Sequence, residues 1–244
     1  MKNLKKSLST FLQIIAMSLL LSSCEDVKLD PELSQSEIVE GLKSALKVGT
    51  DTSVTTLNAV NGYYGDNLVK ILLPEEAAVI VKNIGLIPGG DALLEETIKA
   101  INRSAEDAAK EAAPIFVDAI TTITIDDGKT ILKGADDAAT VYLKDKTFIS
   151  LYNNFQPKIN TSLSKELIPG VSAQSSYASL VDKYNAVANK SLGLLKPIIG
   201  NSLSEHTTQK GLDGLFLKVA LEEGKIRNDI SHRVNDILKK VFGN

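Results

Sequence analysis

The segment from Ala92 to Thr124 constrains the fold of this chain more than any other stretch. Its apolar residues alternate between spacings of four and three, the a/d pattern of a helix that packs along a partner helix. Pro114 removes one helical hydrogen bond, so we expect a kink or a division of the helix there. The apolar seam consists of Leu94, Ile98, Ile101, Ala105, Ala108, Ala112, Ile115 and Ala119. The charged residues expected on the opposite, exposed side are Glu95, Glu96, Lys99, Arg103, Glu106, Asp107, Lys110 and Glu111.

Helical patterns occupy most of the sequence on both sides of this segment. Ser34 and Glu37 have the spacing of a capping box, which predicts a helix reaching about Leu57. Asp91 is expected to cap the Ala92 helix. Residues 67–73 fit a short strand or an apolar half-turn, and residues 192–199 fit an apolar connector broken by glycine and proline. The other expected helices span about 74–85, 126–134, 138–146, 147–163, 175–189, 201–223 and 229–243.

Composition supports the same fold class. Aromatic residues make up 5% of the chain and Trp is absent, which suits helices better than a β-sandwich or barrel. The sequence shows no internal repeat and no composition break that would divide a second domain. We therefore predict an all-α protein, a single-domain bundle of about eight helices with short connections over residues 34–243.

The first 23 residues have the features of a cleaved signal peptide. Lys2, Lys5 and Lys6 precede a mostly apolar run over 8–21, which is too short for a membrane-spanning helix. Leu21-Ser22-Ser23-Cys24 resembles the lipobox of bacterial lipoproteins. The resemblance implies cleavage between Ser23 and Cys24, with lipidation of the Cys24 thiol.

A lipidated Cys24 would fix the location of the mature chain. Two or more acyl chains give a stable membrane anchor, and residues 24–33 would form the tether. The expected location is the bacterial cell envelope, and Glu25 in place of Asp favours the outer membrane while leaving the leaflet open. Cys24 is the only cysteine, so an intramolecular disulfide is excluded.

The charge of the chain argues against nucleic acid as a partner. Residues 1–23 hold three of the 27 basic residues and none of the 30 acidic ones, so the mature chain has a net charge near −6. Binding to phosphate backbones needs a basic patch. The expected partners are therefore the membrane, through the N-terminal acyl chains, and an envelope protein.

Three sequence blocks resemble a known family. They are Ile38-Val-Glu-Gly-Leu-Lys-Ser-Ala-Leu-Lys-Val-Gly-Thr50, Gly134-Ala-Asp-Asp-Ala-Ala-Thr-Val-Tyr-Leu-Lys-Asp-Lys-Thr147, and Gln209-Lys-Gly-Leu-Asp-Gly-Leu-Phe216 with the terminal Ile237-Leu-Lys-Lys-Val-Phe-Gly243. Together they are similar to the bacterial family called domain of unknown function 4197, over about residues 34–243. The resemblance implies an exported helical envelope protein, often a lipoprotein, and implies no activity or site residue. Gly211 stands where the motif favours Ala.

No motif predicts a cofactor, a metal ion or a catalytic centre. Gly128-Lys129-Thr130 lacks the earlier glycine of a phosphate-binding loop. Ser44-x-x-Lys47 and Ser162-x-x-Lys165 lack the companion motifs of penicillin-binding proteins. His206 and His232 match no zinc spacing, and the acidic pairs at 126–127 and 136–137 are expected to cap helices.

The sequence leaves three hypotheses for function. The first is a non-enzymatic binding or interaction module, with a candidate functional surface formed by Asp136, Asp137, Tyr142, Lys144, Asp145 and Lys146. The second is a carrier of an apolar ligand or lipid, in a cavity lined by residues such as Leu151, Phe155, Leu215 and Phe216. The third is an envelope hydrolase, which would need a Ser or Asp beside His206 or His232.

Overall fold

The computed structural model describes residues 33–243, and within this range every regular element is a helix. This confirms the predicted all-α class. A compact unit begins at Ser34, and the buried apolar side chains of the described residues all come from Val39 onward. The unit therefore has a complete core of its own. The predicted signal peptide, Cys24 and nearly all of the tether lie outside the described residues.

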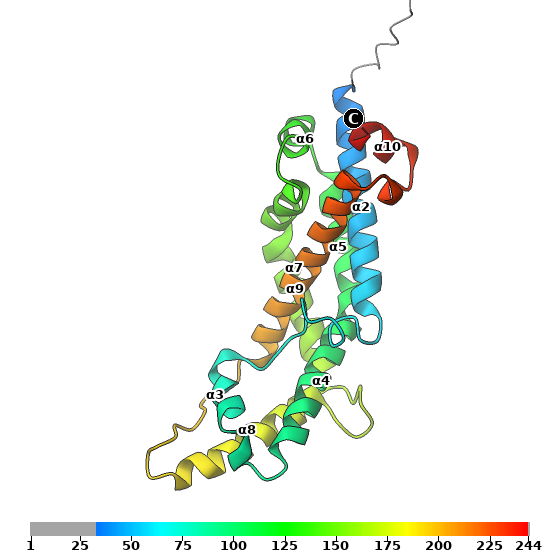
Figure 1. Ribbon diagram of the computed structural model, residues 1–244. Helices are drawn as coiled ribbons and strands as arrows, with labels where there is room; N and C mark the ends of the chain where they lie inside the picture. Colours follow the sequence, from blue (N-terminus) through cyan, green and yellow to red (C-terminus); the bar gives the residue numbers. More distant parts are fainter. Residues whose placement is uncertain (1–32, 244) are drawn as a thin grey trace, which may run out of the picture. The chain divides into compact units, whose positions relative to one another are not determined.

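Three long helices form the centre of the domain (Figure 1). Helix α9 (Leu203–Asn228) packs against both α2 (Gln35–Asn58) and α7 (Ala138–Ser164). Helix α2 begins with the predicted capping box, in which the Ser34 hydroxyl accepts from the Glu37 amide and the Glu37 carboxylate accepts from the Ser34 amide. This box satisfies two of the amides that a helix start leaves unpaired.

The apolar seam is divided in the structure. It forms α4 (Gly90–Ala109), a 3-10 turn η3 (Lys110–Ala112) and α5 (Ala113–Thr121), with Pro114 in the first turn of α5. The buried face follows the prediction from Ile98 to Ala112 and then moves by one residue, to Phe116 and Ile120. The change occurs where the helix is divided, at η3 and Pro114.

The starts of α4 and α7 differ from prediction. Gly89, with φ of +69°, occupies the cap of α4, and Asp91 lies inside the first turn. The two helices predicted over 138–146 and 147–163 are one helix, α7. Asp137 occupies its cap position without a side-chain bond.

The carboxylate that caps α7 comes from α9. Glu223 is 2% exposed, and it accepts hydrogen bonds from the backbone amides of Ala139 at 3.0 Å and Thr140 at 2.7 Å. Arg227, one turn further along α9, donates to the same carboxylate at 2.9 Å and to the carbonyl oxygens that end α6 (Ile125–Leu132). A buried ion pair thus joins α9 to the junction of α6 and α7.

Buried polar side chains of α4 hold the irregular segment between α2 and α4. Asn102 accepts from the Ile71 amide at 2.8 Å and donates to the Ile71 carbonyl at 2.7 Å. Residues 67–69 form a turn and residues 70–73 have no regular structure, so the strand considered for 67–73 does not form. Glu106, predicted to be exposed, is buried because it accepts from the amides of Tyr63 and Tyr64. A turn that buries its amides requires such an acceptor.

The shorter elements lie at two ends of the domain (Figure 1). Helix α6 and the last helix, α10 (Asp236–Phe242), lie near the start of α2. The other end contains α3 (Ala78–Lys82), the 3-10 turn η2 (Ile84–Leu86) and α8 (Ala173–Lys190). That second end contains an open apolar pocket.

Candidate binding site

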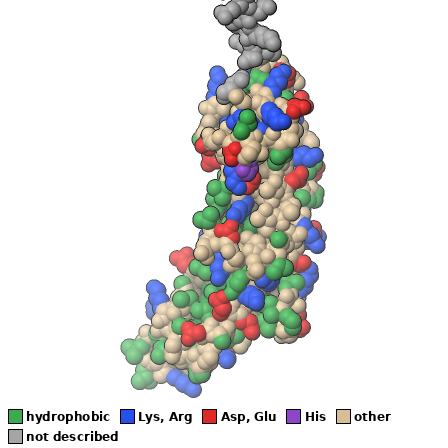
Figure 2. Space-filling view, turned by 45° about the vertical axis from the view of Figure 1, so that its right-hand side comes forward, with side chains coloured by type: hydrophobic (Ala, Val, Ile, Leu, Met, Phe, Trp, Pro, Cys, Tyr) green, Lys and Arg blue, Asp and Glu red, His purple; other side chains and the backbone are tan. Residues whose placement is uncertain are grey.

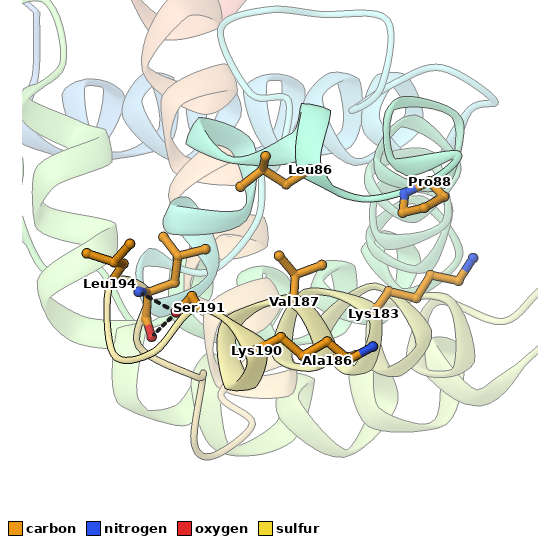
Figure 3. Close-up of a pocket in the computed structure, with 9 residues that line it drawn as sticks. Leu86, Pro88, Lys183, Ala186, Val187, Lys190, Ser191 and Leu194 are labelled. Carbon is orange, nitrogen blue, oxygen red and sulfur yellow. Dashed lines mark hydrogen bonds between the residues drawn. The ribbon is translucent and has the colours of Figure 1, made fainter.

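An apolar pocket lies between η2 and the second half of α8 (Figure 3). Its volume is about 780 Å³, within the usual range of about 300–1,000 Å³ for sites that hold small ligands. Leu86 and Pro88 form one side, and Val187 points from α8 toward Leu86. The pocket is open to solvent. The residues that line it are Leu86, Pro88, Lys183, Ala186, Val187, Lys190, Ser191, Leu194 and Leu195.

Helix α8 positions its half of the pocket through two faces of different character. The helix begins with a capping box of Ser172 and Ser175, and the core face buries Tyr177, Leu180 and Tyr184. Burial raises the pKa of the Tyr177 phenol to about 12, so this hydroxyl stays neutral. The opposite face presents small and aliphatic side chains to the pocket, with lysines at the rim.

The loop after α8 extends the apolar surface beyond the pocket. Leu192, Leu194 and Ile199 are 99%, 88% and 90% exposed. The loop is nevertheless fixed at its base, because the Asn185 side chain accepts from the Ile198 amide at 2.8 Å and donates to the Ile198 carbonyl at 3.0 Å. An ordered backbone thus holds the three large aliphatic side chains in water.

A second, smaller pocket of about 400 Å³ lies between the irregular segment 68–73 and α9. His206 is on its wall, and its Nε2 lies 2.9 Å from the Leu72 carbonyl oxygen. Burial lowers the pKa of His206, although the bond to Leu72 opposes this effect. The neutral imidazole is therefore favoured, with Nε2 as the donor to Leu72.

The two histidines are not brought together. His206 is in the first turn of α9, whereas His232 follows its far end and lies 4.0 Å from Glu222 and 3.8 Å from Asp229. Across residues 33–243, no Ser or Thr hydroxyl hydrogen-bonds either imidazole. The Ser202 hydroxyl, four residues before His206, bonds the Glu76 carboxylate instead.

Ser162 and Lys165, the two residues of one Ser-x-x-Lys pattern, both bond the same carboxylate. The Ser162 hydroxyl donates to the Asp107 carboxylate at 2.6 Å, and the Lys165 ammonium bonds the same oxygen. Burial raises the pKa of Asp107, but the bonds from Lys165 and Ser162 outweigh it and hold the pKa below its ordinary value. A protonated lysine paired with a carboxylate is a poor general base, so this arrangement ties α7 to α4.

The six residues of the predicted functional surface lie on different sides of α7. The Tyr142 hydroxyl donates to Asp127 of α6 at 2.9 Å, and the Lys146 ammonium lies 5.5 Å from the Tyr142 ring. Lys144 faces α9 instead, 3.3 Å from Asp213. Asp136, Asp137 and Asp145 are exposed. The structure therefore brings Tyr142 and Lys146 together and separates them from Lys144.

The residues proposed to line an internal cavity are part of the core. Leu151, Phe155, Leu215 and Phe216 are at most 3% exposed. Phe216 packs edge-on against Phe116, with ring centroids 5.6 Å apart. The apolar surface pocket at α8 was not predicted, and its only signal in the sequence was the apolar connector 192–199.

Between residues 33 and 243, no three His, Cys, Asp or Glu side chains are grouped so that they could hold a metal ion. In the same residues, no helix is both long and apolar enough to cross a membrane.

These features define an all-α domain with an open apolar pocket at one end of its helical core. A family model matches residues 32–243. The chain therefore belongs to that family, which is described as a protein of unknown function (DUF4197). No curated protein and no solved structure matches the chain. The match confirms the family resemblance of the three sequence blocks and assigns no activity.

Proposed function

We propose that this chain is a lipid-anchored protein of the bacterial envelope, in the outer membrane, that acts by binding and not by catalysis. The pocket between η2 and α8 is the proposed binding site. It supports the proposal because it is open, largely apolar and of ligand size, as sites for apolar groups are. The buried carboxylates Glu106 and Glu223 are both occupied by bonds that hold the fold.

The ligand class that fits this pocket is an apolar chain, as in a lipid. This retains the carrier hypothesis but places the ligand at the surface instead of between α7 and α9. Val187 lies inside the pocket, so Val187→Asp would put a carboxylate where the acyl chain would bind. Burying that charge without a partner is strongly unfavourable.

Native mass spectrometry of protein purified from membranes tests the pocket. We expect a lipid adduct on the wild-type protein and its loss in Val187→Asp. Val141→Asp is the matched control, because Val141 is an exposed valine of α7 outside the pocket. A wild-type protein free of adducts, or an adduct that Val187→Asp retains, would refute the carrier function.

The proposed anchor is tested separately at Cys24. Cys24→Ala should abolish metabolic labelling with palmitate and release the protein from the membrane fraction, because no other cysteine is present to take the lipid. Labelling that persists at the wild-type level in Cys24→Ala would refute lipidation at this residue.

A further inference from the structure

The pocket end of the domain combines exposed apolar residues with an uneven distribution of charge. Two segments build this end, Ala77–Gly90 and Lys183–Ser204. Together they contain Lys82, Lys183, Lys190 and Lys196 and not one Asp or Glu. The lining of the pocket itself includes two of these lysines, Lys183 and Lys190, and no Asp or Glu. The adjoining acids along the chain are Glu76, Asp91, Asp182 and Glu205.

Five large aliphatic side chains of these segments are exposed, whereas others, such as Ile80 and Ile198, are buried. Beside the three aliphatic residues of the loop after α8, Leu86 and Val81 of the facing segment are about half exposed. Figure 2 shows hydrophobic and basic side chains at this end of the domain, with acidic side chains among them. Contiguous exposed apolar surface on a soluble domain marks a site that another surface covers.

The backbone conformation of Leu192 in this loop is energetically unfavourable. Leu192 has φ of +55°, in the left-handed region where residues other than glycine are uncommon. Its side chain gains no contact in return, since it is almost fully exposed. The Tyr184 hydroxyl bonds the Lys196 carbonyl at 3.1 Å and Asn185 clamps Ile198, so the loop is held in this form. Such outliers persist where the surroundings impose them and are frequent at functional sites.

We infer that this end of the domain, defined by Leu192, Leu194, Ile199 and the four lysines, docks on the surface of an anionic lipid bilayer. Aliphatic side chains that enter the acyl boundary and lysines that stay at the headgroups are the two components of interfacial membrane binding. The aliphatic residues could equally well be covered by a protein partner, but the two lysines beside the apolar lining of the pocket, which contains no acid, favour an anionic surface. The inference rests on the proposed function and specifies it, because a docked pocket would open toward lipid.

The docking end lies opposite the start of α2 (Figure 1). The residues proposed to dock are all more than 40 positions along the chain from the proposed lipid anchor. The bilayer contact is therefore a property of the domain itself and is measurable without the anchor. The compact unit that starts at Ser34 contains its own core, which justifies a test with residues 24–244 carrying Cys24→Ser.

Flotation with unilamellar vesicles measures the contact. We expect binding to phosphatidylcholine vesicles that contain about 30 mol% phosphatidylglycerol and little binding to phosphatidylcholine alone. Lys183→Gln, Lys190→Gln and Lys196→Gln combined should weaken binding on the order of 100-fold, since each Lys near an anionic surface contributes about fivefold. The control combines Lys47→Gln, Lys129→Gln and Lys133→Gln, three exposed lysines elsewhere, and should bind as the wild type does.

The aliphatic residues are tested in the same way. Leu192→Ser, Leu194→Ser and Ile199→Ser combined should reduce binding by about tenfold or more. The matched control, Val60→Ser, Val141→Ser and Ile149→Ser, removes exposed aliphatic residues from other parts of the domain and should leave binding unchanged. All substituted side chains are exposed, and circular dichroism verifies that each variant keeps the helical fold.

A single tryptophan reports insertion directly, because the chain contains no Trp. The emission of Leu194→Trp should shift to the blue on anionic vesicles, and that of Ile149→Trp should not. A folded protein that fails to float with anionic vesicles overturns the inference, as does binding that neither set of variants weakens. The inference is also overturned if the wild-type protein self-associates without binding vesicles and the loop variants no longer self-associate. That result would assign the surface to a second copy of the chain. The assay uses no acylated protein and no pocket ligand, so its failure is distinct from failure of the proposed anchor or carrier.

Discussion

Replacing Glu223 with Ala is expected to destabilise the domain more than any other single change of an acidic residue on α9. The carboxylate accepts bonds from the first turn of α7 and from Arg227. Alanine leaves two backbone amides without an acceptor. It also leaves the Arg227 guanidinium, whose side chain is 9% exposed, without its ion-pair partner.

The size of the effect follows from these two losses. Loss of a helix cap costs about 0.5–2 kcal/mol, and removal of one member of a buried ion pair costs about 3–5 kcal/mol. The two figures describe the same carboxylate and overlap, so we expect the free energy of unfolding to fall by about 3–5 kcal/mol. For a domain of this length, that corresponds to a fall in Tm of roughly 6–20 °C.

Urea unfolding followed by circular dichroism measures this free energy. Glu222→Ala is the matched control, because Glu222 is the adjacent acid and pairs with Lys225, whose side chain is 50% exposed. An exposed pair contributes about 0–1 kcal/mol. Glu223→Gln keeps one acceptor oxygen without the charge and should fall between the wild type and Glu223→Ala.

A double-mutant cycle separates the cap from the ion pair. If the buried guanidinium accounts for much of the loss, Arg227→Met should cost less in the Glu223→Ala background than in the wild type, by about 0.5–3 kcal/mol. A loss below about 1 kcal/mol for Glu223→Ala would refute the reasoning, because it would fall within the range of surface pairs.

Two further predictions concern α9. Gly214→Ala would place a Cβ 2.9 Å from Cε1 of Tyr63 and 3.3 Å from Cβ of Val69, and we expect it to lower the free energy of unfolding by about 1–3 kcal/mol. In the same urea assay Gly224→Ala, where the nearest atom is 4.0 Å away, should be stabilising by about 0.5–1 kcal/mol, and equal effects of the two would contradict the packing argument. The pKa of His206 is lowered by burial, so the unfolded chain binds a proton that the folded one does not once the pH falls below about 6.5. Stability should therefore be full above about pH 6.5 and fall toward pH 5, and His206→Gln should show a smaller loss over this range than the wild type does.

The sequence correctly predicted the helical features that depend on residues close together in the chain. The Ser34 capping box and the seam from Ile98 to Ala112 depend on neighbours within one or two turns, and both are found as predicted. The shift of the buried face after Ala112 was not predicted, because Pro114 indicated only that the helix would bend or divide. Pro157, by contrast, lies inside the uninterrupted α7.

Residues whose role depends on distant partners were misjudged or missed. Glu106 was predicted to be exposed because it is charged. It is buried because its carboxylate accepts hydrogen bonds from the amides of a turn more than forty residues earlier. The sequence alone does not explain why Gly211 stands where the family motif favours Ala. Its carbonyl accepts the Tyr63 hydroxyl at 2.7 Å, and a Cβ there would lie 3.3 Å from Phe155. The apolar pocket was missed for the same reason, because the sequence of residues 192–199 does not show which distant segment packs opposite them.

The cap that Glu223 provides for α7 also bears on when the domain can fold. The carboxylate follows the amide of Ala139 by 84 positions, and the Gly211 carbonyl follows the Tyr63 hydroxyl by 148. Helices α2 and α7 both pack against α9, which is the last long helix to be synthesised. Contacts so distant in sequence must close large loops before they stabilise anything. The order of the helices therefore delays folding of the centre until α9 has been synthesised.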